Sequence, residues 1–447
     1  MPAAFADSQP VHAIAPSADH RALRFLTAGS VDDGKSTLIG RLLVDSRAIL
    51  SDQLDALHAK AAGGAVDLSL LTDGLEAERE QGITIDVAFR YFATPRRKFI
   101  IADAPGHAQY TRNMVTAAAG SDAAVVLVDP TKIDWRAPVV ELLPQTRRHA
   151  LLARLLRVSS IVFAINKIDA LDDAAAAFLA VRDALRRFAD AAGIEVAGIV
   201  PVSALRGDNV ALPLRAAWFD GPSLLELLER LPTGQESSGG ALAMPVQYVA
   251  RDGEGVGHRA RTLWGRVARG AVRAGDAVQL LPGAQQARVQ ALWRAGQPVA
   301  EAHAGESAGL VLDRALDASR GDWIVAPDTL RENRQFTATL AWLDTEPARV
   351  GRRYLVRHGH RWVQARIGAI EHRLDIHTLQ PTAAQQLAVN DIGEVSIELQ
   401  QPLPLLPFAD NRVGGALIVV DPASHRTSGA LLVREAVPQP RAPSASC

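Results

Sequence analysis

The segment GSVDDGKS, residues 29–36, matches the pattern G-x-x-x-x-G-K-[ST] at every position. It follows the short apolar run 24–28 and opens a helix-like stretch over 35–44. Glycines at this spacing let backbone N–H groups turn toward phosphate oxygens, and the N-terminus of a helix adds positive potential. The segment therefore predicts a binding loop for a nucleoside triphosphate. A chance glycine-rich loop is the alternative.

Two side chains of this loop have predicted chemical roles. Lys35 would reach the β- and γ-phosphates, and the Ser36 hydroxyl would bind Mg²⁺. Only five of the 48 basic residues are lysines, so a lysine at a motif position is less expected by chance. The loop residues predicted to bind the nucleotide are Gly29, Asp32, Gly34, Lys35, Ser36 and Thr37.

A second motif, NKID at residues 166–169, follows the apolar run 161–165 and indicates guanine. The Asp169 carboxylate can accept hydrogen bonds from the N1–H and the exocyclic amine of guanine, and adenine has neither donor at that edge. Asn166 would join this pocket to the phosphate loop, and the stem of Lys167 would lie over the base.

Further along the chain, Ser203 and Ala204 begin the sequence SAL after another apolar run. A backbone N–H in this segment could donate to guanine O6. NKID alone is a weak four-residue pattern, but its place between the phosphate loop and SAL favours GTP over ATP.

Between these motifs, the sequence DAPG at residues 103–106 matches D-x-x-G at the end of an apolar run. Asp103 would hold Mg²⁺ through water, and the Gly106 N–H would sense the γ-phosphate. Thr84, in GIT at residues 82–84, would complete the Mg²⁺ coordination, although GIT alone could be an edge strand. His107 would orient the attacking water, and a surface or packing histidine is the alternative reading. We expect Lys35, Thr84 and His107 to support catalysis.

Composition limits the classes of protein that the chain can represent. Hydrophobic residues make up 48% and charged residues 22%, which excludes a mainly disordered chain. The formal charge of −1 argues against a broadly basic nucleic-acid binder. Cys447 is the single cysteine, so no disulfide framework or thiolate metal site is expected. No apolar stretch reaches about 18 residues and no secretory signal is evident, so we expect a cytoplasmic protein without a membrane span.

The alternation of apolar runs and helix-like stretches up to residue 231 predicts a mostly parallel sheet with helices on both faces. The rest of the chain reads as short strands separated by turns, which predicts two antiparallel β-barrels. In the first barrel we expect strands at 246–250, 262–267, 277–281, 308–312 and 323–325. The expected divisions are a disordered tail (1–21), an α/β P-loop GTPase domain (22–231), a linker (232–241), barrel domains (242–329 and 330–436) and a tail (437–447).

These motifs, in this order, resemble the translation-factor class of GTPases, which includes elongation factor Tu. Several longer segments resemble one family within it, the GTPase subunit of bacterial sulfate adenylyltransferase. The resemblance covers nearly the whole chain, from about residue 21 to residue 433. The segments are 29–43 (GSVDDGKSTLIGRLL), 73–92 (DGLEAEREQGITIDVAFRYF), 102–114 (ADAPGHAQYTRNM), 145–149 (QTRRH), 201–210 (PVSALRGDNV) and 244–249 (MPVQYV).

The resemblance implies that a separate small subunit transfers the adenylyl group of ATP to sulfate, while this chain couples GTP hydrolysis to that reaction. It implies GTP and Mg²⁺ as cofactors and a hetero-oligomer that uses no nucleic acid or membrane. Ala104 stands where the family usually has threonine, at a position that acts through backbone shape. Residues 130–144 form a longer connection than usual, which is either a partner contact or an inert loop.

Some relatives carry a fused adenylyl-sulfate kinase, which needs a phosphate-loop lysine of its own. No lysine follows Lys167, so we expect no fused kinase. Two alternatives share the GTP motifs: an elongation-factor-like translational GTPase and a GTP-binding scaffold without turnover. An independent ATP sulfurylase is disfavoured, because the one phosphate loop is combined with a guanine pocket.

Overall fold

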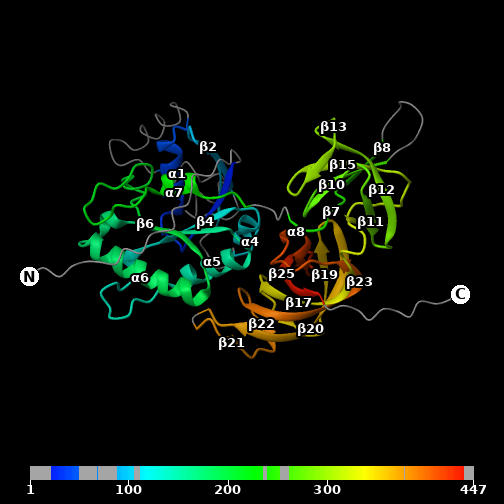
Figure 1. Ribbon diagram of the computed structural model, residues 1–447. Helices are drawn as coiled ribbons and strands as arrows, with labels where there is room; N and C mark the ends of the chain where they lie inside the picture. The colour runs from blue at the N-terminus through cyan, green and yellow to red at the C-terminus, as the bar shows by residue number, and fades with distance from the viewer. Residues whose placement is uncertain are drawn as a thin grey trace, which may run out of the picture. The chain divides into compact units, whose positions relative to one another are not determined.

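The computed structural model describes residues 22–49, 68, 88–104, 111–234, 239–251, 261–376 and 378–436. The chain divides into two compact units, the first ending at Gly234 and the second beginning at Gln235. Figure 1 shows helices and a sheet in the first unit and mainly strands in the second. No helix within these ranges is long and apolar enough to span a membrane.

The first unit is built on a six-stranded sheet with the order β2-β3-β1-β4-β5-β6. Strands β3, β1, β4, β5 and β6 run parallel, and β2 pairs with β3 in the antiparallel direction. The strands are β1 (Leu23–Ala28), β2 (Ala88–Ala93), β3 (Lys98–Asp103), β4 (Ala123–Val128), β5 (Ser160–Ile165) and β6 (Val196–Pro201).

Helices pack on both faces of this sheet, with α1 and α7 on one side and α5 and α6 on the other (Figure 1). Alternate residues of the central strands, such as Leu26 and Val126 on one face and Phe25 and Val125 on the other, are all buried. The helical elements are α1 (Lys35–Asp45), α4 (Thr111–Ala119), η3 (Pro130–Lys132), α5 (Pro144–Leu155), η4 (Ile168–Ala170), α6 (Ala174–Ala192) and α7 (Leu224–Arg230).

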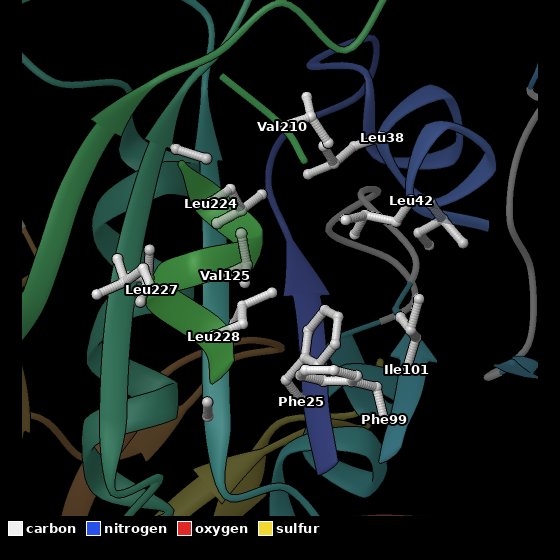
Figure 2. Packing of buried hydrophobic residues seen from close by; sticks show 14 of the residues in the cluster. Phe25, Leu38, Leu42, Phe99, Ile101, Val125, Val210, Leu224, Leu227 and Leu228 are labelled. Carbon is white, nitrogen blue, oxygen red and sulfur yellow. The ribbon is translucent and has the colours of Figure 1, made fainter. Parts of the chain in front are cut away.

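The core under α1 and α7 gathers leucines from both helices against aromatic and branched side chains of the sheet (Figure 2). The Phe99 ring stacks on Phe92 with centroids 4.6 Å apart and meets Phe25 edge to face at 6.4 Å. α7 begins at a capping box in which Ser223 and Glu226 satisfy each other's backbone N–H groups. Burial of such side chains supplies most of the stability of the helices.

The second unit contains two antiparallel β-domains. In the first, the strands pair in the order β7-β16-β11-β12-β15-β9-β8, with β13 on β12 and a separate pair β10–β14. These strands are β7 (Ala243–Pro245), β8 (Tyr248–Arg251), β9 (Arg261–Arg266), β10 (Ala271–Arg273), β11 (Ala277–Leu281), β12 (Gln285–Arg294), β13 (Gln297–Val299), β14 (Glu301–His303), β15 (Ser307–Leu312) and β16 (Trp323–Val325).

The second β-domain is a closed barrel, because β19 pairs with β24 at one side and with β20 at the other. A short pair, β18–β22, lies beside the ring, and a short helix precedes β24. The elements are β17 (Glu332–Trp342), β18 (Ala348–Arg349), β19 (Arg353–His358), β20 (Arg361–Leu374), β21 (Pro381–Thr382), β22 (Gln386–Leu387), β23 (Ile392–Pro404), α8 (Arg412–Gly415), β24 (Ala416–Val420) and β25 (Thr427–Ala436).

The two β-domains contact each other within this unit. The side-chain amide of Asn411, which is buried, donates to the Ala268 carbonyl at 2.7 Å. The rings of Trp323 and His358 stack with centroids 5.3 Å apart and an interplanar angle of 7°. His358 is also buried, and its Nε2 lies 3.1 Å from the Gly414 carbonyl oxygen.

The predicted fold class is confirmed, but the first β-domain also contains the unpredicted short strands β7, β10, β13 and β14. The strand expected at 246–250 is present as β8 but begins at Tyr248: Val246 and Gln247 separate β7 from β8, and their amides bond to the carbonyls of Asp322 and Trp264. The ten-residue strand β12 was not predicted. Residues 286–291 alternate polar and apolar, but the alternation ends at Leu292 and Trp293, after a register shift between Val289 and Ala291.

Candidate nucleotide-binding site

Predicted site residues within the described part of the chain cluster because four parallel strands end at the same edge of the sheet. Gly29 follows β1, Asp103 ends β3, Asp129 follows β4 and Asn166 follows β5. In register, Thr27 lies opposite Asp103, and Val128 lies opposite Ile165. The carboxyl edge of an open α/β sheet is where ligands bind. Four sequence segments far apart in the chain therefore meet at one position.

The phosphate loop has the backbone geometry that its glycines predict. Gly34 has φ +90°, and a Cβ built on it would overlap Nδ2 of Asn166. Asp32 also has a positive φ of 61°. The Lys35 ammonium is buried and donates to the carbonyls of Gly29 at 3.1 Å and Ser30 at 2.8 Å. The loop thus curls around the cation predicted to meet the β- and γ-phosphates.

Burial lowers the pKa of the Lys35 ammonium, while the carboxylates of Asp103 and Asp33 act in the opposite direction. Those carboxylates favour the charged form on which phosphate binding depends. A second cation, Lys132, lowers the same pKa. Charges of both signs, from the two carboxylates and from Lys132, therefore act on the Lys35 ammonium.

The Mg²⁺ donors predicted from the sequence fit their surroundings. Asp103 is 2% exposed, and its Oδ1 accepts a hydrogen bond from Thr27 Oγ1 at 3.2 Å. Ser36 and Thr37, both partly buried, lie in the first turn of α1, directly after the loop. Hydroxyl and carboxylate oxygens, supplemented by phosphate and water, are the ligands that Mg²⁺ prefers. Ser36 and Asp103 could supply the protein's share of such a shell.

Asn166 joins three predicted segments through its side-chain amide. Its Nδ2 donates to the Asp33 carbonyl at 2.8 Å, and its Oδ1 accepts from the Ala204 N–H at 2.9 Å. Ser203, which is fully buried, accepts a hydrogen bond from the Arg206 N–H at 3.0 Å. The Ala204 amide, a candidate donor to guanine O6, is therefore bonded to Asn166 in this structure.

The two charged residues of NKID contact different side chains. Lys167 has φ 61°, and its Nζ lies 2.6 Å from Asp129 Oδ2. Asp169 is on the short helix η4, and its side chain is 11% exposed, with Oδ2 3.6 Å from Arg206 Nε. Burial alone would raise the pKa of the Asp129 carboxyl, but hydrogen bonds from Lys167 and Thr131 outweigh it and lower the pKa.

Three predicted site residues, Thr84, Gly106 and His107, lie outside the described residues. Conversely, the structure adds side chains that the sequence interpretation did not assign: Thr27, Asp33, Asp129 and Lys132. A signal existed for two of them. Asp129 follows a buried strand as Asn166 does, and Lys132 is one of only five lysines in the chain.

The described geometry is that of an elongation factor Tu-like GTPase, and comparisons with known families agree. Residues 20–233 match the elongation factor Tu GTP binding domain, 261–325 match elongation factor Tu domain 2, and 335–434 match the GTP-eEF1A C-terminal domain-like family.

Curated relatives narrow this class to one family. "Sulfate adenylyltransferase subunit 1" of Laribacter hongkongensis is 44% identical over 93% of this chain and 86% of its own length. The protein of the same name from Citrobacter koseri is 42% identical, with the same coverage. "Bifunctional enzyme CysN/CysC" of Xylella fastidiosa is 44% identical, and the matched region covers 91% of this chain and 65% of that enzyme. The chain belongs to the sulfate adenylyltransferase subunit 1 family, rather than to the translation factors.

Proposed function

We propose that this chain is a GTPase that couples GTP hydrolysis to the synthesis of adenylyl sulfate and pyrophosphate from ATP and sulfate by a separate catalytic subunit. The observation that carries GTP binding is the Asn166 junction, which joins the phosphate loop, NKID and SAL. Family membership supports the coupling to sulfate adenylylation. The cytoplasmic location expected from the sequence stays a prediction.

In the proposed site, the phosphates lie over the loop and the guanine lies at Asp169. Gly29 and Gly34 would give the loop its curvature, and Asp32, Lys35 and Thr37 would bind the phosphates. Ser36, Thr84 and Asp103 would hold Mg²⁺, which neutralises charge on the transferring phosphoryl group when bound. Lys35 would stabilise the charge that develops on the β- and γ-phosphate oxygens.

The remaining predicted roles concern the γ-phosphate. His107 would orient the attacking water, and the Gly106 N–H and Thr84 hydroxyl would register whether the γ-phosphate is present. A GTPase can drive a partner's reaction only if its GTP and GDP states interact differently with that partner. We propose a small catalytic sulfate adenylyltransferase subunit as the partner in a hetero-oligomer.

The decisive experiment measures GTP turnover and adenylyl sulfate together. The chain is combined with its cognate small subunit, ATP and sulfate, in the presence of GTP, GDP or a non-hydrolysable GTP analogue. We expect the complete mixture to stimulate GTP hydrolysis, and adenylyl sulfate to accumulate with GTP alone among the three nucleotides. Equal accumulation with all three would contradict the coupling, and GTP binding without stimulated turnover would support a scaffold.

The variant Thr84→Ala tests whether Thr84 is needed for the stimulation of GTP hydrolysis but not for GTP binding. The variant should still bind GTP, because the loop and base contacts remain, but it should lose most of the stimulation by partner and substrates. Measured GTP affinity provides the control. Full stimulation in the variant would exclude Thr84 as the residue that registers the γ-phosphate.

A further inference from the structure

The phosphate loop contains a buried carboxylate, that of Asp33, which is 0% exposed. Its Oδ2 accepts a hydrogen bond from the Ser30 N–H at 2.6 Å, so it holds the loop in its curl. A buried negative charge next to a triphosphate site opposes binding unless a cation compensates it. The loop geometry therefore requires a cation close to Asp33.

Lys132 is the cation that forms an ion pair with Asp33, and the Lys35 ammonium also interacts electrostatically with this carboxylate. The Nζ of Lys132 lies 3.0 Å from Asp33 Oδ1, and it also donates to the Val31 carbonyl of the same loop. Lys132 comes from η3, more than ninety positions along the chain, and its side chain is 35% exposed. Lys35 instead donates to the Gly29 and Ser30 carbonyls, so the two lysines bond to different parts of the loop.

Asp129 fixes the position of Lys132. The Asp129 carboxylate is fully buried and caps η3 through the Thr131 N–H at 2.9 Å. Its Oδ2 lies 2.6 Å from Lys167 Nζ and 3.8 Å from Lys132 Nζ. Two lysines and two buried carboxylates thus connect NKID to the phosphate loop.

We propose that Lys132 is a positioning residue for nucleotide binding, which neutralises Asp33 and holds the phosphate loop in its binding conformation. It acts through Asp33 and the Val31 carbonyl. This inference rests on the proposed function as far as GTP is the ligand. It also gives a role to the first part of the connection 130–144, whose role the sequence left open.

The proposal predicts an effect that depends on ligand charge. Without Lys132, the Asp33 carboxylate loses its ion-pair partner and only the Lys35 ammonium offsets its charge, so Lys132→Met should weaken GTP binding on the order of tenfold, GDP less and guanosine least. Lys132→Arg should retain most of the affinity. Lys132→Gln, which can still donate to the Val31 carbonyl without a positive charge, should show the same order of losses as Lys132→Met.

A double-mutant cycle with Asp33 complements the single variants of Lys132. Asp33→Asn removes the charge that Lys132 compensates, so adding it to Lys132→Met should recover most of the lost GTP affinity. Asp33→Asn alone should weaken GTP far less than Lys132→Met. Lys98→Met, at an exposed lysine that begins β3, is the matched control and should bind all three ligands as the wild type does.

The experiment measures dissociation constants for guanosine, GDP and GTP with Mg²⁺, and the thermal unfolding of each variant. Equal losses for all three ligands, or no recovery in the double variant, would overturn the inference. So would unchanged GTP affinity in Lys132→Met while the wild type binds GTP, an outcome that leaves the proposed function intact. A wild type that fails to bind GTP would reject the proposed function itself. If Lys132→Met does not fold, Lys132→Gln and its combination with Asp33→Asn give the same comparison.

Discussion

Gly34 and Asn166 are in such close contact that no side chain fits between them. A Cβ on Gly34 would overlap the Asn166 amide nitrogen, which donates to the neighbouring Asp33 carbonyl. The glycine that the phosphate-loop pattern requires is thus also required by the guanine motif. The two nucleotide-binding motifs constrain each other through this contact.

Gly34→Ala should therefore weaken nucleotide binding for two reasons. The new Cβ displaces Asn166, and the φ of +90° is unfavourable for alanine. We expect GTP affinity to fall on the order of tenfold or more. Calorimetric titration with GTP measures the loss, and Gly239→Ala, at an exposed glycine with open space around its Cβ position, is the control. Unchanged affinity would show that the loop relaxes without cost.

Asp169→Asn should change the preferred base. An amide N–H₂ can face the C2 oxygen of xanthine, whereas the carboxylate matches the two donors of guanine. GTP binding should weaken and xanthosine triphosphate binding should improve, as measured by competition between the two nucleotides. A variant that keeps its full preference for GTP would place the base elsewhere.

Lys35→Ala should abolish GTP turnover in a folded protein. Loss of one electrostatic contact to the transition state typically lowers the rate on the order of 10²–10³-fold. Turnover is measured with the partner subunit, ATP and sulfate present, and circular dichroism checks the fold. Ordinary turnover would remove Lys35 from the catalytic machinery.

His107→Ala tests a residue outside the described part of the chain. If His107 orients water, stimulated hydrolysis should slow much more than GTP binding weakens, because water positioning matters mainly in the transition state. Single-turnover rates and GTP affinity are compared in the same preparation. Parallel losses would indicate a structural histidine.

His358 should make the second unit sensitive to acid. Burial lowers its pKa to about 4, although the Gly414 carbonyl favours the protonated ring. Between pH 6.5 and 4 the unfolded chain binds a proton that the folded chain does not, so the free energy of unfolding falls as the pH falls. From pH 7 to pH 5 this amounts to about 2 kcal/mol.

His358→Gln should remove this part of the pH dependence. Urea unfolding at pH 7 and pH 5, followed by tryptophan fluorescence, measures the difference from the wild type. His425→Gln, at an exposed histidine of the same unit, should keep the wild-type dependence. A pH dependence that is identical in the wild type and His358→Gln would contradict the depressed pKa.

The phosphate loop and the guanine motif could be predicted from the sequence because each is defined by a few consecutive residues. Residues 29–36 and 166–169 have the residue types and spacing that phosphate and guanine chemistry demand, whatever surrounds them. The parallel sheet was equally predictable, since buried strands such as 123–128 are nearly continuous apolar runs. β12 was not predicted because its alternation of polar and apolar residues covers only 286–291 and is interrupted at Leu292 and Trp293.

The pairing of Lys132 with Asp33 could not be predicted in this way. The two residues belong to different segments and come together because β1 and β4 are neighbours in the sheet and end at the same edge. Their separation of 3.0 Å depends on strand register and on the cap that Asp129 provides for η3. Local order along the chain specifies which groups can contact a nucleotide. The packing of distant segments specifies which charged side chains pair with each other, because electrostatic interactions depend on distance in space.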